Sequence, residues 1–173
     1  MAAKPDAIAL LKADHRKVED LFGKYEKSRA KKADIAKQIC MELTIHTMIE
    51  EEIFYPACRE AGVDSDKMDE ANVEHDGAKA LIAELEAGTP DDDFYDAKVK
   101  VLSEEIKHHV KEEEQKGGIF SLAREAELDL ASLGQQMAAR KKELMAQFQA
   151  DGLPAPMTLT MKAPPLGQAS TAA

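Results

Sequence analysis

Four stretches in which apolar residues recur every three to four positions constrain the fold more than any other feature of this sequence. Polar or glycine-containing breaks separate them at residues 27–33, 61–64 and 88–90. Such spacing places apolar side chains on one face of an α-helix. Short connections make successive helices antiparallel neighbours. The pattern therefore predicts an all-α fold, an antiparallel up-down-up-down four-helix bundle.

Signals that start helices precede these stretches. Asp6, beside Pro5, opens the first helix, and Asp34 is expected to cap the second. Asp64, or the serine after it, opens the third. For the fourth helix we expect Thr89 to be the cap, with proline in the first turn and Phe94 on the apolar face.

Composition and charge exclude several other classes of protein. The chain of 173 residues carries a net charge of -10, which would repel nucleic acid, and only 5% of its residues are aromatic. No apolar run approaches a membrane span, and no targeting signal follows Lys4. Cys40 and Cys58 lie too far apart on one predicted helix to pair, and free thiols suit a reducing compartment. We therefore expect a cytoplasmic protein that binds neither nucleic acid nor membranes.

The chain continues beyond the fourth predicted helix. Glycines 117 and 118 interrupt the helical pattern, so residues 1–122 are expected to form the bundle and residues 123–150 an additional helix. Residues 151–173 hold four of the seven prolines and are expected to be a disordered or loosely docked tail. Within the tail, residues 157–161 alternate in polarity and suit a short extended strip on a groove. The last helix and the tail are candidate contacts for a protein partner.

Four of the five histidines fall on the apolar faces of the predicted helices, one on each helix. At about 100° per residue, each has apolar residues three, four or seven positions away. The fifth, His108, has Glu104 and Glu112 one turn away and is expected on a solvated face. The inward histidines are His15, His46, His75 and His109.

Two of the inward histidines are followed four residues later by a glutamate on the same helix face. A carboxylate there is costly to bury unless it is paired or bound to a cation. A His–Glu ion pair, or a glutamate that reaches water past the core, would explain one such motif. Two motifs on alternate helices, each with an inward histidine on the helix between, favour a metal site. The pairs are His46 with Glu50 and His109 with Glu113.

Counting residues from the turns puts the four histidines at one level only if residues 89–93 are partly non-helical. Imidazole and carboxylate together suit iron, zinc or manganese. Four histidines and two glutamates exceed the four ligands of a tetrahedral zinc. Two metals bridged by both glutamates would use all six, and would leave positions for solvent, oxide or a small molecule.

With these motifs the sequence resembles the hemerythrin-like proteins, the HHE cation-binding domain family, over about residues 7–122. The segments that carry the resemblance are Asp14-His15-Arg16, residues 46–56, Glu74-His75 and residues 109–114. The resemblance implies a non-haem di-iron centre with two iron ions, oxo- or hydroxo-bridged. The ligands that it implies are His15, His46, Glu50, His75, His109 and Glu113.

Two departures separate this chain from the oxygen carriers of that family. The carriers have a further histidine where this chain has Lys79, whose ammonium is expected to turn away from the site or to pair with a glutamate. They also end with aspartate five residues after the last histidine, where this chain has glutamate after four. We therefore expect a protein that binds or senses oxygen, peroxide or nitric oxide rather than a reversible carrier.

Two alternatives remain at this stage. The first is an iron-sensing or interaction protein in which the metal stabilises the bundle. The second is a weak peroxidase or nitric oxide converter, which ranks lower because no general acid or base beyond the ligands stands out.

Overall fold

Residues 5–161 are described by the computed structural model, and every regular element among them is helical. The all-α class predicted from the sequence is confirmed for this part of the chain, which contains no strand. None of its helices is both long and apolar enough to cross a membrane. The elements are α1 (Ala7–Lys27), α2 (Lys32–Ile49), the π-helical turn η1 (Glu50–Phe54), α3 (Tyr55–Glu60), α4 (Ser65–Ala87), α5 (Tyr95–Glu114), α6 (Ile119–Glu125) and α7 (Leu130–Asp151).

Side-chain caps confirm the predicted starts of the first and third helices. The carboxylates of Asp6 and Asp64 each accept a hydrogen bond from a backbone N–H of the first turn, at 2.7 and 3.0 Å. The second helix begins earlier than expected, at Lys32, so the prediction that Asp34 caps it is wrong. Asp34 lies instead in the first turn, where its charge favours the positive end of the helix dipole.

The fourth helix begins later than predicted, so the expected cap at Thr89 is wrong. The residues before α5 form turns, in which the Asp92 carboxylate accepts a hydrogen bond from Thr89 N at 2.6 Å. Phe94, expected on the apolar face, has a left-handed φ of 66° and is 78% exposed. Because these turns are non-helical, they absorb the excess length and bring His109 to the level of the other inward histidines.

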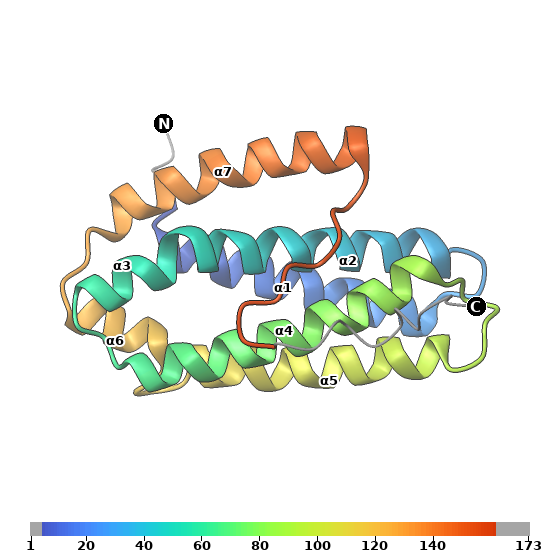
Figure 1. Cartoon of the computed structure of the whole chain (residues 1–173), viewed down its shortest axis with the longest axis horizontal. Helices are drawn as coiled ribbons and strands as arrows, with labels where there is room; N and C mark the ends of the chain where they lie inside the picture. Colours follow the sequence, from blue (N-terminus) through green and yellow to red (C-terminus); the bar gives the residue numbers. More distant parts are fainter. Residues whose placement is uncertain (1–4, 162–173) are drawn as a thin grey trace, which may run out of the picture.

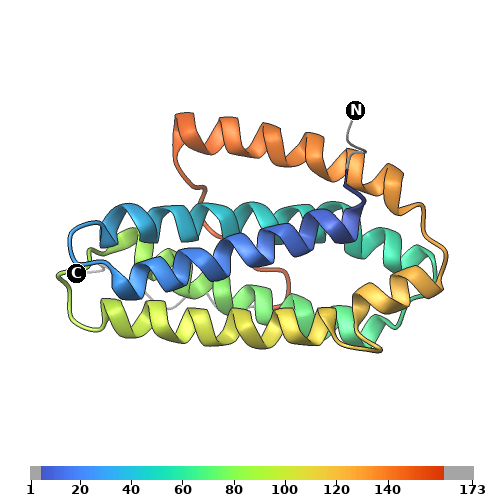
Figure 2. The same ribbon diagram turned by 180° about the vertical axis from the view of Figure 1, so that it is seen from behind.

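The helices α1, α2 with α3, α4 and α5 lie lengthwise side by side, as rods, in both views of the chain (Figure 1 and Figure 2). α1 contacts α2 and α5, and α4 contacts α5 and α2. α2, η1 and α3 follow one another without a break and make up one of the rods. The described part of the chain therefore brings the inward faces of all four rods into one interior.

Two apolar clusters fill this interior, and a polar layer lies between them. His15 lies between Leu11 of one cluster and Val18 of the other, and the three other inward histidines are flanked in the same way. Burying apolar side chains on both sides of a histidine and carboxylate layer removes that layer from water, which raises the cost of any unpaired charge there.

The additional helix α7 packs across α1, α2 and η1. Met137, Leu144 and Phe148 are buried on its inner face. α7 crosses the start of α1 at Gly134, where an added Cβ would lie 2.6 Å from the carbonyl oxygen of Pro5. This close approach requires glycine, and it shows that the apolar face of α7 is used within the chain.

Gly134→Ala is expected to destabilise the protein by about 1–3 kcal/mol, because the added methyl group overlaps the backbone at the start of α1. Gly23→Ala is the matched control, since Gly23 lies within α1 and an added Cβ there meets nothing within 4 Å. The control should stabilise the protein by about 0.5–1 kcal/mol. Urea unfolding measures both changes, and equal effects would contradict the close crossing of α1 and α7.

After α7 the chain turns back, and residues 152–161, here called the C-terminal strap, run across α2 to α4 (Figure 1). Three consecutive backbone N–H groups, ending at Met161, and the hydroxyl of Thr160 donate to the Asp76 carboxylate at 2.6–3.1 Å. The expected contact of residues 157–161 with the helices is therefore found on α4. The rest of the predicted tail, residues 162–173, lies outside the described residues.

Candidate metal centre

The inward histidines and glutamates come together between the two apolar clusters, and all six side chains are buried. Their ligand atoms form two groups, and within each group these atoms lie within 4.8 Å of one another. Glu50 belongs to both groups. The first group is His15, His46, Glu50 and Glu113, and the second is Glu50, His75 and His109.

The four Nε2 atoms form two close pairs, each 3.2 Å apart, His15 with His46 and His75 with His109. One carboxylate oxygen of each glutamate lies 3.2–3.6 Å from one histidine of each pair. Each carboxylate therefore contacts a histidine of both pairs. The contacts are Glu50 with His46 and His75, and Glu113 with His15 and His109.

A carboxylate also faces the other ring nitrogen, Nδ1, of each histidine. Three of these distances are 2.7–2.9 Å and the fourth is 3.8 Å. At 2.7–2.9 Å a carboxylate favours a proton on Nδ1, orients the ring and leaves the Nε2 lone pair for a metal. At 3.8 Å, Asp14 and His46 Nδ1 are not hydrogen-bonded to each other. The braces are Glu114 on His15, Asp14 on His46, Glu51 on His75 and Glu74 on His109.

The arrangement repeats between two helix pairs, α1 with α2–η1 and α4 with α5. In each pair an acid-His dipeptide on the first helix is followed on the second by the motif His-x-x-x-Glu-Glu. The acid of each dipeptide faces Nδ1 of the histidine on the other helix of the same pair. Asp14 faces His46, and Glu74 faces His109. The last glutamate of the motif braces the histidine of the opposite pair. Each pair therefore supplies half of the centre.

Lys79 stands where an oxygen carrier would have its further histidine. Its side chain is buried, and Nζ donates to both oxygens of Glu51 at 2.8 Å and to Met157 O of the C-terminal strap at 3.0 Å. The prediction that the ammonium pairs with a glutamate is confirmed. Because Glu51 in turn contacts His75 Nδ1, Lys79 supports a histidine instead of offering a further ligand.

Basic groups also pair with the three other braces from outside. His108 is 61% exposed, which confirms the predicted solvated face, and lies 3.4 Å from Glu74. These pairs give each of the three braces a second partner. The two remaining pairs are Arg16 with Glu114 and Lys141 with Asp14.

Burial and nearby charges shift the pKa values of the two central carboxyl groups in opposite directions. Burial raises the pKa of Glu50 well above its usual value, and the negative charge of Glu113 adds to the rise. Burial also acts on Glu113, but the nearby His109 and His15 outweigh it and lower its pKa to about 2. Burial lowers the pKa of His46 to about 4. At pH 7 the metal-free centre therefore holds an anionic Glu113 and a neutral His46, and the raised pKa of Glu50 favours its protonated form over that of an ordinary glutamate.

Three carboxylate oxygens of the centre have no hydrogen-bond partner among the described residues, both oxygens of Glu50 and Oε2 of Glu113. An unsatisfied buried carboxylate is costly, and a cation is the partner that removes this cost. Imidazole nitrogens and carboxylate oxygens at these distances are donors that transition metals accept. The buried His/Glu cluster is therefore compatible with metal binding.

The π-helical turn η1 lies at the centre itself. Within it, the consecutive residues Glu50 and Glu51 contact the two ring nitrogens of His75, at 3.3 and 2.9 Å. Directly after it, Tyr55 Oη donates to Glu113 Oε1 at 2.8 Å in a fully buried contact. Short π-helical turns of this kind are frequent at functional sites, because they re-aim side chains within a helix.

Tyr55→Phe is expected to destabilise the metal-free protein by about 1–3 kcal/mol, because buried Glu113 Oε1 loses its donor while the ring volume is retained. Tyr25→Phe is the control. Its hydroxyl donates to Asp96, whose side chain is 59% exposed, so water can replace the lost bond. Chemical unfolding of both metal-free variants is the measurement, and equal losses would contradict the buried contact.

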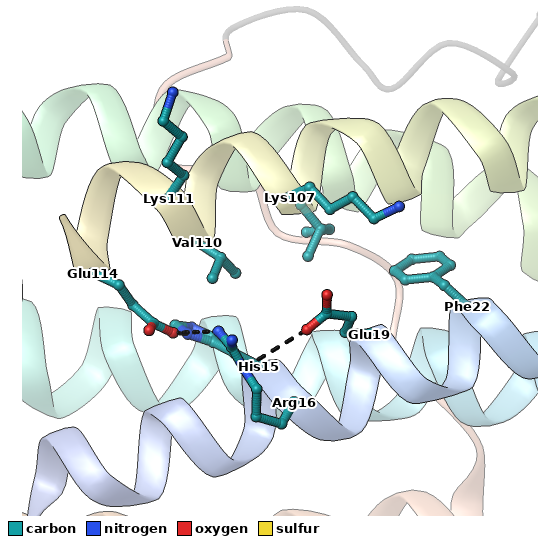
Figure 3. A pocket seen from close by; sticks show the side chains of 9 residues that line it. His15, Arg16, Glu19, Phe22, Lys107, Val110, Lys111 and Glu114 are labelled. Atoms are coloured by element: carbon teal, nitrogen blue, oxygen red, sulfur yellow. Dashed lines mark hydrogen bonds and ion pairs between the residues drawn. The ribbon is translucent and has the colours of Figure 1, made fainter.

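A small apolar cavity adjoins the histidine rings, and a surface pocket approaches it between α1 and α5. The cavity measures about 10 Å³, and Val18 and Leu43 are among its walls. That volume admits roughly one water-sized molecule. The outer pocket, of about 270 Å³, is shown in Figure 3. His15, Ile106 and Val110 line both spaces, so these side chains separate the outer pocket from the centre.

Sequence reasoning identified the six central side chains but not the groups that support them. Asp14 and Glu74 each directly precede an inward histidine, and Glu51 and Glu114 each directly follow an inward glutamate. Adjacency to a candidate ligand is the signal that could have found these braces. Tyr55 carries no such signal, because the π-helical turn before it changes the face on which it lies.

Gly117 and Gly118 follow the end of α5, and Gly118 packs against the backbone of Glu113. Gly117 has a left-handed φ of 77°, which favours glycine. A Cβ added at Gly118 would lie 2.6 Å from the carbonyl oxygen of Glu113 and even closer to that of Glu112. The interruption seen in the sequence is therefore a helix end that packs tightly against a central residue of the site.

Comparisons with known proteins agree with this geometry. The model of the hemerythrin HHE cation binding domain matches residues 6–116, which include all six central side chains. The crystal structure of a hemerythrin HHE cation binding domain-containing protein from Mycobacterium kansasii shares the fold, with a TM-score of 0.72 and 21% identity, covering 86% of this chain and 95% of that one.

A DNA nickase from Nostoc sp. (strain PCC 7120 / SAG 25.82 / UTEX 2576) is 30% identical over 107 residues. The match covers 61% of this chain but only 30% of the nickase. More than half of the chain matches the domain model, and the matched part contains the whole His/Glu cluster. The chain therefore belongs to the hemerythrin HHE cation binding domain family.

Proposed function

We propose that the protein is an antiparallel four-helix bundle that holds two iron ions and binds or senses a small ligand, either oxygen, peroxide or nitric oxide. The observation that carries the proposal is the pair of carboxylates that each span both histidine pairs. His15 and His46 would hold one ion and His75 and His109 the other, with Glu50 and Glu113 as bridges. Iron would supply reversible oxidation and open coordination positions at these sites.

The residues around the centre support a small ligand. The cavity beside the histidines holds about one water-sized molecule, and its exposed lining is apolar. The three braces within hydrogen-bond distance, on His15, His75 and His109, keep these Nε2 atoms aimed at the centre, so most of the ligand set is pre-organised. A cavity this small excludes organic substrates, which limits the proposal to diatomic molecules and peroxide.

Sensing is favoured over carriage by the contacts of Lys79. Its ammonium contacts Glu51, which braces His75, and also the carbonyl of Met157 in the C-terminal strap. A change of charge at the centre would therefore act on a group that also holds a surface segment. A net charge of -10 disfavours DNA as a partner, and the matched nickase is a much longer protein, of which this chain covers 30%.

The test is elemental analysis of the full chain after anaerobic reconstitution with ferrous iron. Two ions per chain are expected, because the ligand atoms form two groups that share Glu50. The visible spectrum of the reconstituted protein should change on addition of peroxide or nitric oxide. One zinc and no iron after reconstitution would overturn the proposal.

Val110→Trp is expected to slow association of nitric oxide with the iron-loaded protein about tenfold, equivalent to about 1.4 kcal/mol of added barrier. The reason is that Val110 separates the outer pocket from the cavity at the histidines. Stopped-flow absorbance measures the rate, and the iron content should be unchanged. Lys107→Trp, at the outer pocket alone, is the control. Equal slowing by both variants would contradict this route.

A further inference from the structure

A larger cavity, of about 650 Å³, lies between α2, α4, α7 and the C-terminal strap. Its walls are mostly apolar and come from all four elements. Thr47 lines both this cavity and the small one at the histidines, so a single side chain separates the two spaces. The main apolar contributors are Met48, Ile82, Leu144, Phe148, Leu153 and Met157.

The strap closes this cavity through a specific clamp. Asp76 is fully buried, and four donors from the end of the strap satisfy its carboxylate. Lys79 adds a bond to the carbonyl of Met157. Pro154 and Pro156 line the cavity in the span before the clamp, where proline keeps the chain extended. A buried carboxylate would be costly without these donors, so Asp76 on α4 holds the strap in its closed position.

The charges around the cavity indicate the kind of ligand that it accepts. Among the described residues that line it, the cations are Lys79 and Arg140, and each is already paired. Lys79 contacts Glu51 at 2.8 Å, and Arg140 contacts Glu52 through two nitrogens, at 2.7 and 3.1 Å. Glu86 adds an exposed carboxylate at the rim. An anionic headgroup therefore finds no free cation. A cationic headgroup meets Glu86 only at the exposed rim, where water and salt screen the attraction, and the rest of the lining is mainly apolar.

We propose that this cavity is a binding site for one neutral and mainly apolar small molecule, of the class of medium-chain alcohols, which the strap covers. Its volume lies within the roughly 300–1,000 Å³ range of sites for organic ligands. The hydroxyl of Thr44 and the amide of Gln147, both in the lining, are the polar groups available to a neutral headgroup. The proposal is independent of iron, because no wall of the cavity is one of the six central side chains.

The test is titration of the metal-free full chain with N-phenyl-1-naphthylamine, a neutral apolar fluorophore. Saturation at one probe per chain is expected, with a blue-shifted emission. 1-Decanol should displace the probe at a concentration about tenfold lower than decanoate or decylammonium, a difference of about 1.4 kcal/mol. Binding without saturation, or equal displacement by the three compounds, would overturn the proposal.

Cavity-filling variants locate the bound probe. Ala83→Trp places an indole in the lining and should weaken probe binding at least about tenfold, whereas Ala138→Trp at an exposed position of α7 should not. Leu153→Asp, in the strap and outside any helix, puts a charge in the cavity without altering a rod and should weaken binding as strongly. Unchanged probe binding in Ala83→Trp and Leu153→Asp would show that the probe lies elsewhere, and would overturn the proposal.

Discussion

Glu50→Ala is expected to remove both iron ions from the protein, whereas His109→Ala should remove only the ion of its own pair. Glu50 is shared by both groups of ligand atoms and contacts a histidine of each pair, at 3.2 and 3.3 Å. His109 belongs to one group. Iron content after anaerobic reconstitution and gel filtration is the measurement, and protein concentration comes from amino-acid analysis.

His108→Ala is the matched control for these variants, since His108 neighbours His109 but is 61% exposed. It should retain the iron content of the unmodified protein. Glu74→Ala, which removes the brace on His109, should lower iron affinity by about 10–100-fold without abolishing it. Equal iron loss in the His108 and His109 variants would show that the helix register at the centre is different.

The affinity for iron is expected to rise about tenfold per pH unit for each proton that binding releases. Burial and the charge of Glu113 raise the pKa of Glu50, which favours its protonated form in the metal-free protein, and iron binding would displace that proton. The stability that Glu50 contributes without metal has the opposite dependence. It is fully present below the ordinary carboxyl pKa and is lost as pH rises through the raised pKa.

Calorimetric titration with ferrous iron in buffers of different ionisation enthalpy counts the released protons. Unfolding of the metal-free protein across the same pH range provides the second readout. Glu50→Gln cannot ionise, so its metal-free stability should lack the decline with rising pH. An affinity for iron that stays constant with pH would contradict a protonated Glu50.

The helix periodicity of this sequence is sufficient to predict the rods and the faces that they bury. Every inward histidine was placed from its apolar neighbours, and each lies between the two apolar clusters. Glu50 and Glu113 were predicted to lie on the inward faces because each follows an inward histidine by one helical turn, and both are buried. Local geometry decides these features, because one helical turn relates residues that are close in the sequence.

Features that depend on distant parts of the chain were not predictable in the same way. The sequence around Asp76 predicts an exposed acid on a helix. Its burial is explained by the hydrogen bonds that it accepts from the backbone of residues 159–161. The role of Tyr55 depends on the π-helical turn, which no periodicity indicates. The late start of α5 follows from the turn around Asp92, whose carboxylate competes with the expected cap at Thr89.

The repetition of the two helix pairs bears on the order in which the chain folds. Each pair is built from helices joined by a short connection, so it can form through contacts that are local in sequence, and such contacts form fast. The glutamates, however, each contact a histidine of both pairs, so the proposed centre is complete only when the pairs have docked. Iron should therefore bind after the pairs dock and should chiefly slow unfolding. Hydrogen exchange on iron removal should rise first where the pairs meet, before any helix melts.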